Sequence, residues 1–341
     1  MIERKSQITI LMPVYNGAPY IQEAIDSILN QTFKDFKLLI INDGSTDATQ
    51  TIIESYKDER IKSIQQSNMG VSRSLNKGLD IIETPYIRRH DADDISEPWM
   101  LEKQMTFLEE HPEISFVSTQ CAFMTENSRI SFKYRQPKQH LFENNDYIIV
   151  NKTHFNPYSP IVHGTVLGPT KIFKEFGGYR TQFLTSEDND LWLRIIEKYK
   201  FAVLNACPYY LRLSGNSATK MHKTSVPFYR ELAIAYAQER QASGSDPIMR
   251  GEPIPQPPTG SPPETTKDQS LTKKGKLLRS DILNFQYRIF VNARDWQLIA
   301  QAIRLSLRDG WKLKQTWRGI LFPLLGENLV NIGVKIKSWF K

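Results

Sequence analysis

The first hundred residues contain four short apolar runs, and the first three are each followed by a segment with helical spacing. The strongest runs are Ile8–Val14 and Phe36–Asn42, which are almost continuously apolar, as expected for strands buried on both faces of a parallel sheet. The weaker runs are Ile61–Gln65 and Tyr86–Arg89. Strands that alternate with helices in this way predict a doubly wound α/β sheet with right-handed crossovers.

Polar loops follow three of these predicted strands, at the sheet edge where ligands bind in such folds. They are Pro13-Val14-Tyr15-Asn16, Asp43-Gly44-Ser45 and Asp91-Ala92-Asp93. An aspartate beside a glycine that lets a ligand approach the backbone can accept hydrogen bonds from a base or a sugar. For Asp43 and Asp47 the alternative is an Asx-turn and a helix cap. Three such loops together favour a ligand site.

The loop after the fourth run carries three carboxylates within four positions, Asp91, Asp93 and Asp94. Along an extended chain, Asp91 and Asp93 point to the same side about 7 Å apart, and Asp94 points to the other side. Carboxylate oxygens of this kind suit Mg²⁺ or Mn²⁺, which take one or two carboxylates and complete their coordination with water and phosphate oxygens. The alternative is a solvated acidic turn that caps the next helix.

A second acidic segment, Glu187-Asp188-Asn189-Asp190, precedes a predicted helix over residues 190–199. As an ordinary acidic helix start it is stabilised by the helix macrodipole, and loss of one such carboxylate is expected to cost ~1 kcal/mol or less. Asp190 is expected to have only this structural role. Nothing within the segment itself separates this interpretation from a catalytic one.

Five motifs, taken in order, resemble the signature of family-2 glycosyltransferases with the GT-A fold. They are Pro13-Val14-Tyr15-Asn16, Asn42-Asp43-Gly44-Ser45-Thr46-Asp47, Asn68-Met69-Gly70, Asp91-Ala92-Asp93-Asp94 and Glu187-Asp188-Asn189-Asp190-Leu191-Trp192. The resemblance covers roughly residues 7–240, and the ordered set is specific although each motif alone is weak. It implies a mixed, doubly wound sheet flanked by helices. It also implies an inverting transferase that uses a divalent metal, Mg²⁺ or Mn²⁺, and a nucleotide diphosphate sugar, with UDP donors favoured.

The resemblance implies roles for single residues as well. Asp43 is expected to hold the donor base, Asp91 the ribose side and Asp93 the metal that bridges the diphosphate. Asp188 is expected to be the base that acts on the acceptor hydroxyl. A metal at Asp93 would stabilise the charge of the leaving diphosphate, and in-line inversion needs a base away from the metal, because a metal-bound carboxylate is a weaker proton acceptor. Further donor-binding residues are expected to be Pro13, Tyr15, Asn16 and Asn68.

One position departs from the family pattern. Many members carry a histidine in the strand after the base helix, where it helps to bind the metal or the diphosphate. Here Ser214 stands in that place, and serine is a poor metal ligand. The expectation is weak metal binding, with the metal held by Asp93 and water alone or with Arg212 compensating on the phosphates.

The acceptor side is predicted between the two acidic segments. Residues 161–167 are predicted to form a strand, with His163 as a packed or hydrogen-bonded member of it. Aromatic side chains in this half could stack on sugar faces, although such residues more often belong to the core. The candidates are Trp99, Tyr158, Tyr179 and Trp192.

The net charge of +7 is concentrated near the C-terminus. Residues 267–341 contain 15 Lys or Arg and 5 Asp or Glu, a net charge of +10, which leaves −3 for the first 266 residues. Nucleic acid is therefore not an expected partner, because the body of the protein is not basic. The basic, aromatic-rich tail instead predicts contact with an anionic surface, such as a membrane that carries a lipid-linked acceptor.

Composition divides the chain into three predicted parts. They are a GT-A domain over residues 1–240, a Pro- and Gly-rich linker over 241–268, and a basic amphipathic helical region over 269–341. The last part is expected to pack on the body or to lie on a membrane surface. With two cysteines, no stretch of signal-peptide length and no window apolar enough to span a bilayer, the predicted location is the cytoplasm. Peripheral attachment to the inner face of the membrane is the alternative.

These features together predict an inverting glycosyltransferase that acts on a glycan or lipid-linked acceptor in the synthesis of a cell-surface polysaccharide or glycolipid. Two other classes remain open. A sugar nucleotidyltransferase would need a glycine-rich, basic phosphate loop after the first strand, where this chain has Pro13-Val14-Tyr15-Asn16-Gly17. A non-catalytic protein that binds a nucleotide sugar or a membrane surface would hold a donor without releasing its nucleotide.

Overall fold

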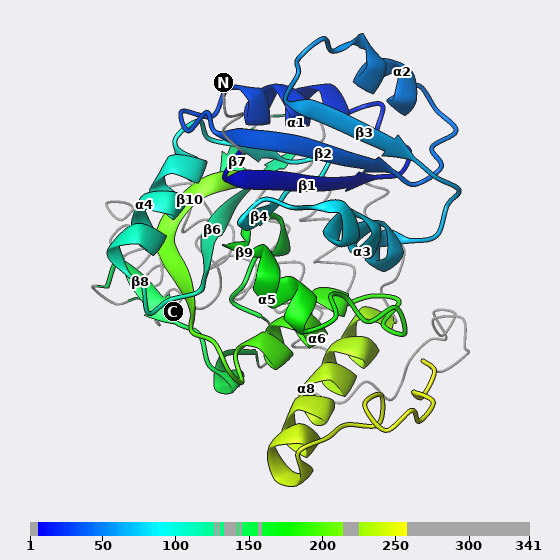
Figure 1. The fold of residues 1–341 in the computed structure, drawn as a ribbon, viewed down its shortest axis with the longest axis vertical. Coiled ribbons are helices and arrows are strands. Elements are labelled where there is room, and N and C mark those ends of the chain that lie inside the picture. The colour runs from blue at the N-terminus through cyan, green and yellow to red at the C-terminus, as the bar shows by residue number, and fades with distance from the viewer. Residues whose placement is uncertain are drawn as a thin grey trace, which may run out of the picture. The chain divides into compact units, whose positions relative to one another are not determined.

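A computed structural model describes residues 6–125, 128, 130–132, 142, 145–155, 159–213 and 225–257. Within these residues a mixed sheet is flanked by helices (Figure 1). The strands are β1 (Ile8–Val14), β2 (Phe36–Asn42), β3 (Ile61–Gln65), β4 (Tyr86–Arg89), β5 (Ile95–Ser96), β6 (Phe116–Thr125), β7 (Ile130–Phe132), β8 (Tyr147–Ile149), β9 (Leu167–Pro169) and β10 (Phe201–Leu213). The helices are α1 (Ile21–Leu29), α2 (Thr49–Ser55), α3 (Val71–Ile81), α4 (Met100–Glu110), α5 (Thr170–Glu175), α6 (Glu187–Ile195) and α8 (Ser225–Ser243), with short 3₁₀ turns η2 (Lys152–Phe155) and η3 (His163–Thr165).

The sheet follows the order β3-β2-β1-β4-β9-β6-β10-β5. In addition, β7 pairs with β6, and β8 pairs with β10. The four strands predicted from the apolar runs form its parallel part, since β1 pairs in parallel with both β2 and β4, and β2 pairs in parallel with β3. The added strand β9 runs antiparallel to β4, and β5 runs antiparallel to β10. The predicted doubly wound mixed sheet flanked by helices is confirmed.

Alternate residues of β1 face two separate apolar layers. Ile8, Ile10 and Met12 pack with α1, α2 and α4 on one face, and Leu11 packs with α3, α5, α6 and α8 on the other. This arrangement explains why β1 is almost continuously apolar, because a strand covered by helices on both sides has no solvated face.

Contacts divide the chain into two units. The first unit comprises residues 1–122 and 134–259, and the second comprises 123–133 and 260–341. In the described part of the second unit, the end of β6 and β7 form an antiparallel hairpin. In the first unit, α8 continues to Ser243 and Asp246 is completely buried, so residues 241–257 belong to the body rather than to the predicted linker. The remaining residues of the predicted linker and the predicted C-terminal region, 269–341, lie outside the described residues.

Two local predictions change in the structure. In the predicted strand over residues 161–167, the structure has the 3₁₀ turn η3 at His163–Thr165, and β9 begins only at Leu167. The helix predicted over residues 190–199 begins three residues earlier, at Glu187, and ends at Ile195. Among the described residues, no helix is both long enough and apolar enough to cross a bilayer.

Candidate active site

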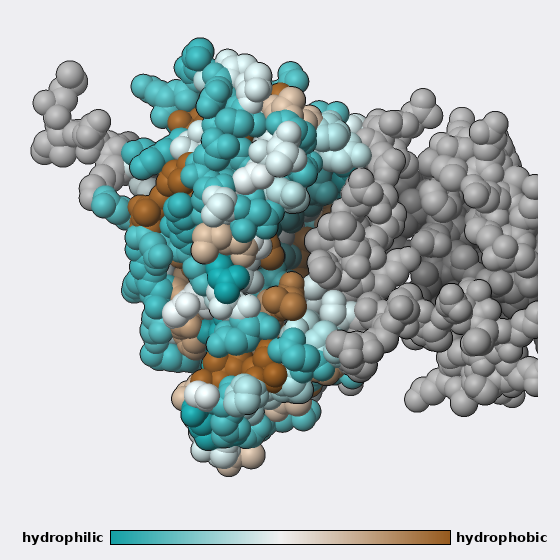
Figure 2. All heavy atoms as spheres, turned by 90° about the vertical axis from the view of Figure 1, so that its right-hand side faces the viewer, coloured by the Kyte–Doolittle hydropathy of each residue, from teal (hydrophilic) through white to brown (hydrophobic). Residues whose placement is uncertain are grey.

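The loops after β1 and β2 interlock at the carboxyl ends of the parallel strands, the side that faces the viewer in Figure 2. Asn16 adopts a positive φ of 50°, its N–H donates to Ser45 Oγ at 2.9 Å, and its Oδ1 accepts from the Thr46 N–H at 2.8 Å. The Ala18 N–H donates to Asp47 Oδ2 at 3.0 Å. These bonds fix the two loops relative to each other. Asn16 and its neighbour Tyr15, which is 53% exposed, lie at the surface beside them, and Pro13 is half-buried at the end of β1.

Asp43, the residue predicted to hold the donor base, is only 4% exposed. Its Oδ1 accepts from Gln66 Nε2 at 2.7 Å and from the Met69 N–H at 2.9 Å, and its Oδ2 accepts from the Gly70 N–H at 2.8 Å. Asp43 therefore holds the loop that carries the exposed Asn68. The adjacent Gly44 has a φ of +77°, and a Cβ there would lie 2.7 Å from the Asn68 nitrogen, so this close approach requires glycine. The contact of Asp43 with a base stays a prediction.

Arg89, at the end of β4, is the buried cation of the acidic loop. It is 4% exposed, and its Nη2 donates to Asp91 Oδ1 at 2.6 Å. Burial raises the pKa of Asp91, but the charge and hydrogen bond of Arg89, together with His163 and His90, outweigh this effect, and the pKa lies below its ordinary value. The structure thus pairs Asp91 internally while leaving its side chain 35% exposed.

Asp93 and Asp94 are in different environments. Burial and the charge of Asp91 raise the pKa of the half-buried Asp93 to about 6. Asp94 is 2% exposed and its Oδ1 accepts from the Arg212 N–H at 2.8 Å. Burial, with the charges of Asp91 and Asp93, raises the pKa of Asp94 well above its ordinary value. Asp94 therefore connects the acidic loop to β10, whereas Asp91 and Asp93 are available to a ligand.

Arg212, the expected substitute phosphate ligand, is bonded within the protein in this structure. Its guanidinium is completely buried, donates from Nε to the Asp93 carbonyl at 2.6 Å and from Nη2 to Glu23 Oε2 at 2.8 Å, and lies over the Tyr20 ring. Arg212 therefore supports the backbone of the acidic loop. Ser214, which stands where many family members have a histidine, lies outside the described residues.

Asp188 and Glu187 are in the first turn of α6, directly after Ser186 with a φ of 59°. Burial raises the pKa of Asp188 to about 6, and the charge of Asp91 adds to the increase. Burial and the charge of Asp188 raise the pKa of Glu187 to about 8. The start of α6 and the acidic loop, nearly a hundred residues apart in sequence, are therefore close enough to interact electrostatically. The charge of Arg89, for example, lowers the pKa of both Asp188 and Glu187.

Asp190 faces away from these groups. It is completely buried and forms ion pairs with Arg180 at 3.3 Å and with Arg194 at 2.9 Å. The predicted structural role is right in kind, but the environment is a buried network rather than a solvated helix start.

The 3₁₀ turn η3 closes the site between the two acidic segments, and the sequence did not indicate this. His163 Nε2 is 2.9 Å from Tyr179 Oη, and burial, together with the charge of Arg89, lowers the pKa of His163 to about 3, so the ring is neutral. A Cβ on Gly164 would lie 2.6 Å from Asp91 Oδ2 and even closer to the Tyr209 hydroxyl. Two signals could have revealed these neighbours. A glycine inside an apolar run indicates close approach, and an arginine in a buried strand requires a carboxylate partner.

The aromatic candidates separate by burial. Trp192 and Tyr179 are 0% and 3% exposed and belong to the core, Trp99 is 40% exposed, and Tyr158 lies outside the described residues. Among the candidates that the structure describes, only Trp99 therefore has an exposed ring on which a sugar could stack.

The acidic loop has the donor chemistry of a divalent-cation site. In the described ranges, no three His, Cys, Asp or Glu side chains converge on a common point. Mg²⁺ and Mn²⁺ need only one or two protein carboxylates when phosphate oxygens and water complete the coordination. The negative charge of Asp91 contributes to the raised pKa of Asp93, and a bound cation would offset the repulsion between the two carboxylates. Asp93, with Asp91 beside it, fits a metal bound together with a diphosphate.

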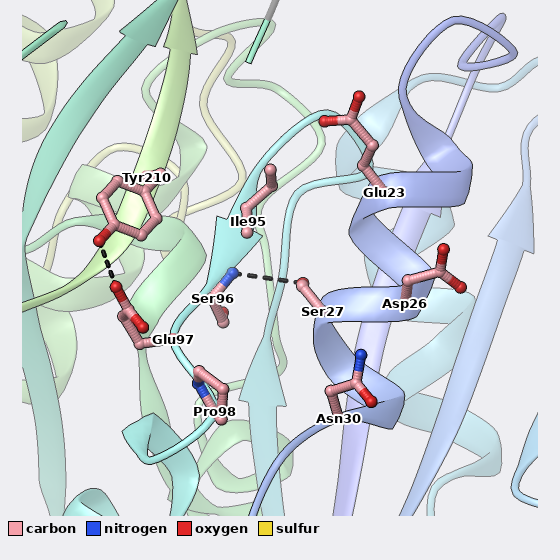
Figure 3. Close-up of a pocket in the computed structure, with 9 residues that line it drawn as sticks. All are labelled: Glu23, Asp26, Ser27, Asn30, Ile95, Ser96, Glu97, Pro98 and Tyr210. Atoms are coloured by element: carbon pink, nitrogen blue, oxygen red, sulfur yellow. Dashed lines mark hydrogen bonds between the residues drawn. The ribbon is translucent and has the colours of Figure 1, made fainter. Parts of the chain in front are cut away.

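A hollow of about 370 Å³ lies elsewhere, between α1, β5 and β10 (Figure 3). Its carboxylates are already bonded within the protein, because Asp26 accepts from Tyr56, Glu97 from Tyr210 and Glu23 from Arg212. Its lining includes neither Asp91, Asp93 nor Asp188. It is therefore not the site described above.

Comparison with known proteins identifies the family of this chain. The model of the family described as Glycosyl transferase family 2 matches residues 9–173. An uncharacterized glycosyltransferase of Methanocaldococcus jannaschii is 34% identical over 244 residues, which cover 69% of this chain and 81% of that protein. EpsE of Bacillus subtilis, a protein named as a glycosyltransferase, is 34% identical over 202 residues, covering 56% of this chain and 67% of EpsE.

The fold is also similar to that of a solved structure. The crystal structure of residues 1–349 of Staphylococcus aureus TarS in complex with UDP-GlcNAc has a TM-score of 0.53 at 17% identity, and the alignment covers 90% of this chain and 93% of TarS 1–349. Because the match to the Methanocaldococcus jannaschii protein covers most of that protein, and because the family model and the fold agree with it, this chain is a member of glycosyltransferase family 2 with a GT-A-like fold.

Proposed function

We propose that this enzyme is an inverting glycosyltransferase that moves a sugar from a nucleotide diphosphate donor to an acceptor hydroxyl, in the synthesis of a cell-surface polysaccharide or glycolipid. The observation that carries the proposal is the electrostatic contact between Asp188, with a pKa of about 6, and the acidic loop that ends β4. A UDP-type donor is favoured, and the similarity in fold to TarS, whose crystal structures are in complex with UDP and UDP-GlcNAc, supports that class.

The proposed reaction divides the work between three carboxylates. Asp188 accepts the proton of the acceptor hydroxyl as the oxygen attacks the sugar from the face opposite the nucleotide, and its pKa near 6 keeps it ionised at neutral pH. Arg89 holds Asp91 in place for the ribose side of the donor. Asp93 would hold the divalent cation, which when bound supplies Lewis acidity to the leaving diphosphate.

A donor screen tests the proposal. Purified protein is incubated with a panel of UDP-, GDP-, CDP- and dTDP-sugars with Mn²⁺ or Mg²⁺, and nucleotide release is measured with and without EDTA. Metal-dependent release from one donor, increased by glycan or lipid-linked acceptors, supports the proposal. Binding of a nucleotide without release from any donor would instead support the non-catalytic alternative.

Replacing Asp93 should separate metal binding from folding. Asp93→Ala is expected to remove the Mn²⁺-dependent part of nucleotide affinity, because the half-buried carboxylate is the proposed ligand, while the melting temperature changes little. Calorimetric titration of UDP with and without Mn²⁺ gives the affinity. Asp94→Ala is the matched control, and it should lower the melting temperature instead, since it removes the buried oxygen that accepts from the Arg212 N–H of β10. If both changes have equally small effects on the Mn²⁺-dependent affinity for UDP, the acidic loop does not bind the metal and only caps the next helix.

We also propose that the basic region over residues 267–341 brings the enzyme to an anionic membrane surface. Its net charge of +10 supports this proposal, since well-placed basic residues contribute about 1 kcal/mol each at such a surface. The full chain is expected to sediment with anionic liposomes at low salt and to be released as salt screens the charges. A variant shortened after Pro257, the last described residue of the body, should not sediment. Full-length protein that stays in solution at low salt would contradict this role.

A further inference from the structure

Three arginines and three carboxylates form an alternating, largely buried network behind the start of α6, and Glu197 at its end is 27% exposed. In order they are Arg194, Asp190, Arg180, Asp246, Arg240 and Glu197. Asp190 and Asp246 are both 0% exposed. The network connects α6 to α8 and to the segment that follows α8, which lies well beyond the part of the chain that the family model matches.

The first half of the network anchors the first turn of α6. Asp190, two residues after Asp188, accepts from Arg194 Nε at 2.9 Å and from Arg180 Nη1 at 3.3 Å. Arg194 in turn donates to the carbonyls of Phe176 and Gly178 at 2.6 and 2.8 Å. The turn that precedes Arg180 is therefore bonded to the helix that carries Asp188.

The second half is centred on Asp246. Its Oδ2 accepts from Arg180 Nη1 at 2.7 Å and from Arg240 Nη1 at 2.6 Å, and its Oδ1 accepts from the Met249 N–H at 2.9 Å. Burial raises the pKa of Asp246, but the hydrogen bonds from Arg180, Met249 and Arg240 outweigh it and leave the pKa below its ordinary value. Asp246 is thus ionised and satisfied.

Arg180 is the residue that joins the two halves. If it is removed, Asp190 still has Arg194 and Asp246 still has Arg240. The residue before it, Tyr179, contacts His163 in the turn η3, next to Asp91. Arg180 therefore lies in a turn that contacts α6 and, through Tyr179, the turn η3 beside Asp91.

Stability alone does not account for such a network. Buried ion pairs are often no more stabilising than apolar residues of the same size, because both ions lose their hydration. The helices α6 and α8 already share an apolar core that includes Leu193, Tyr229 and Ala233. What the network adds is a fixed direction for the first turn of α6, and an error of about 1 Å in the place of a catalytic group can cost about 10²-fold in rate.

We propose that Arg180 is a positioning residue that holds Asp188 in its reactive place by linking Asp190 to Asp246. This inference rests on the proposed function, with Asp188 as the base. Arg180 does not touch the substrates. It acts through the buried carboxylates on either side of it.

Arg180→Gln is the test variant, and its transfer rate is compared with that of the parent. The kcat for sugar transfer is expected to fall about 10- to 100-fold, while the KM for the donor and the affinity for the free nucleotide stay near the parent values. Circular dichroism and the melting temperature establish that the variant is folded. Arg180→Lys, which keeps a positive charge at this position, should recover part of the rate. Glu252→Gln, an exposed partner of Arg250 in the same segment, is the control and should keep the parent rate.

A double-mutant cycle with Asp188→Asn distinguishes positioning from a general structural effect. If Arg180 acts through Asp188, adding Arg180→Gln to Asp188→Asn should lower the residual rate less than twofold. An equal loss in both backgrounds, or a parent-like rate for Arg180→Gln alone, would overturn the positioning role. A parent enzyme that transfers sugar from no donor would overturn the proposed function as well, and this is observed before any variant is made.

Discussion

Asp188→Asn should lower sugar transfer by about 10²–10⁴-fold while nucleotide binding stays near the parent value. A general base typically contributes that factor, and asparagine keeps the shape of aspartate without its proton affinity. Donor affinity should survive because the groups assigned to the nucleotide, Asp43 and Asp91, belong to other loops. The measurement is kcat for transfer at saturating donor, beside the dissociation constant of UDP in the presence of Mn²⁺.

The pH profile provides an independent check on the same residue. Burial raises the pKa of Asp188 to about 6, so the deprotonated base is lost as the pH falls through that value. At saturating donor and Mn²⁺, where the bound cation keeps Asp93 deprotonated although its pKa is also about 6, the parent rate should rise with pH through about 6 and level off above it, and Asp188→Asn should lack this rise. Because Asp91 and Glu187 interact with Asp188, the observed value belongs to the group of carboxyls.

Glu187→Gln is the matched control for this assignment. The pKa of Glu187 is raised to about 8, so the side chain is mostly protonated at neutral pH and glutamine resembles that form. It should cost much less activity than Asp188→Asn. A folded Glu187→Gln enzyme that is less active than Asp188→Asn would assign the base to Glu187, and full turnover in both variants would place the base elsewhere.

The parallel half of the sheet could be predicted because its signal is local. Four apolar runs, with Ile8–Val14 and Phe36–Asn42 the clearest, are long enough to identify buried strands, and chirality leaves few ways to connect them. The acidic loop was visible for the same reason, since Asp91 and Asp93 are neighbours in sequence. Interactions within a few residues of chain are therefore recovered without the structure.

The partners of these groups could not be predicted, because they come from distant parts of the chain. Asp91 depends on the approach of η3, where Gly164 leaves room that any side chain would fill. Asp246 lies in a segment rich in glycine and proline that resembles a linker, and only its burial between Arg180 and Arg240 shows otherwise. Local composition carries no information on such pairings.

Asp190 is the residue whose energetic role changes most. In sequence it is one of several carboxylates at a helix start, where the loss of one would cost ~1 kcal/mol or less. In the structure it is completely buried between Arg180 and Arg194. Removing one member of a buried ion pair leaves an uncompensated charge, which typically costs about 3–5 kcal/mol.

Asp190→Ala should therefore lower the free energy of unfolding by about 3–5 kcal/mol, measured by urea denaturation with the slope of the transition unchanged. The loss is expected toward the lower end of this range, because Arg180 keeps Asp246 and Arg194 keeps two backbone carbonyls. Asp190→Asn should lose less, since its amide oxygen can still accept from Arg194. Glu252→Ala, which removes an exposed carboxylate, should hardly move the transition. If Asp190→Ala unfolds at the same urea concentration as the parent, the buried network does not hold α6, and its proposed role in placing Asp188 loses its physical basis.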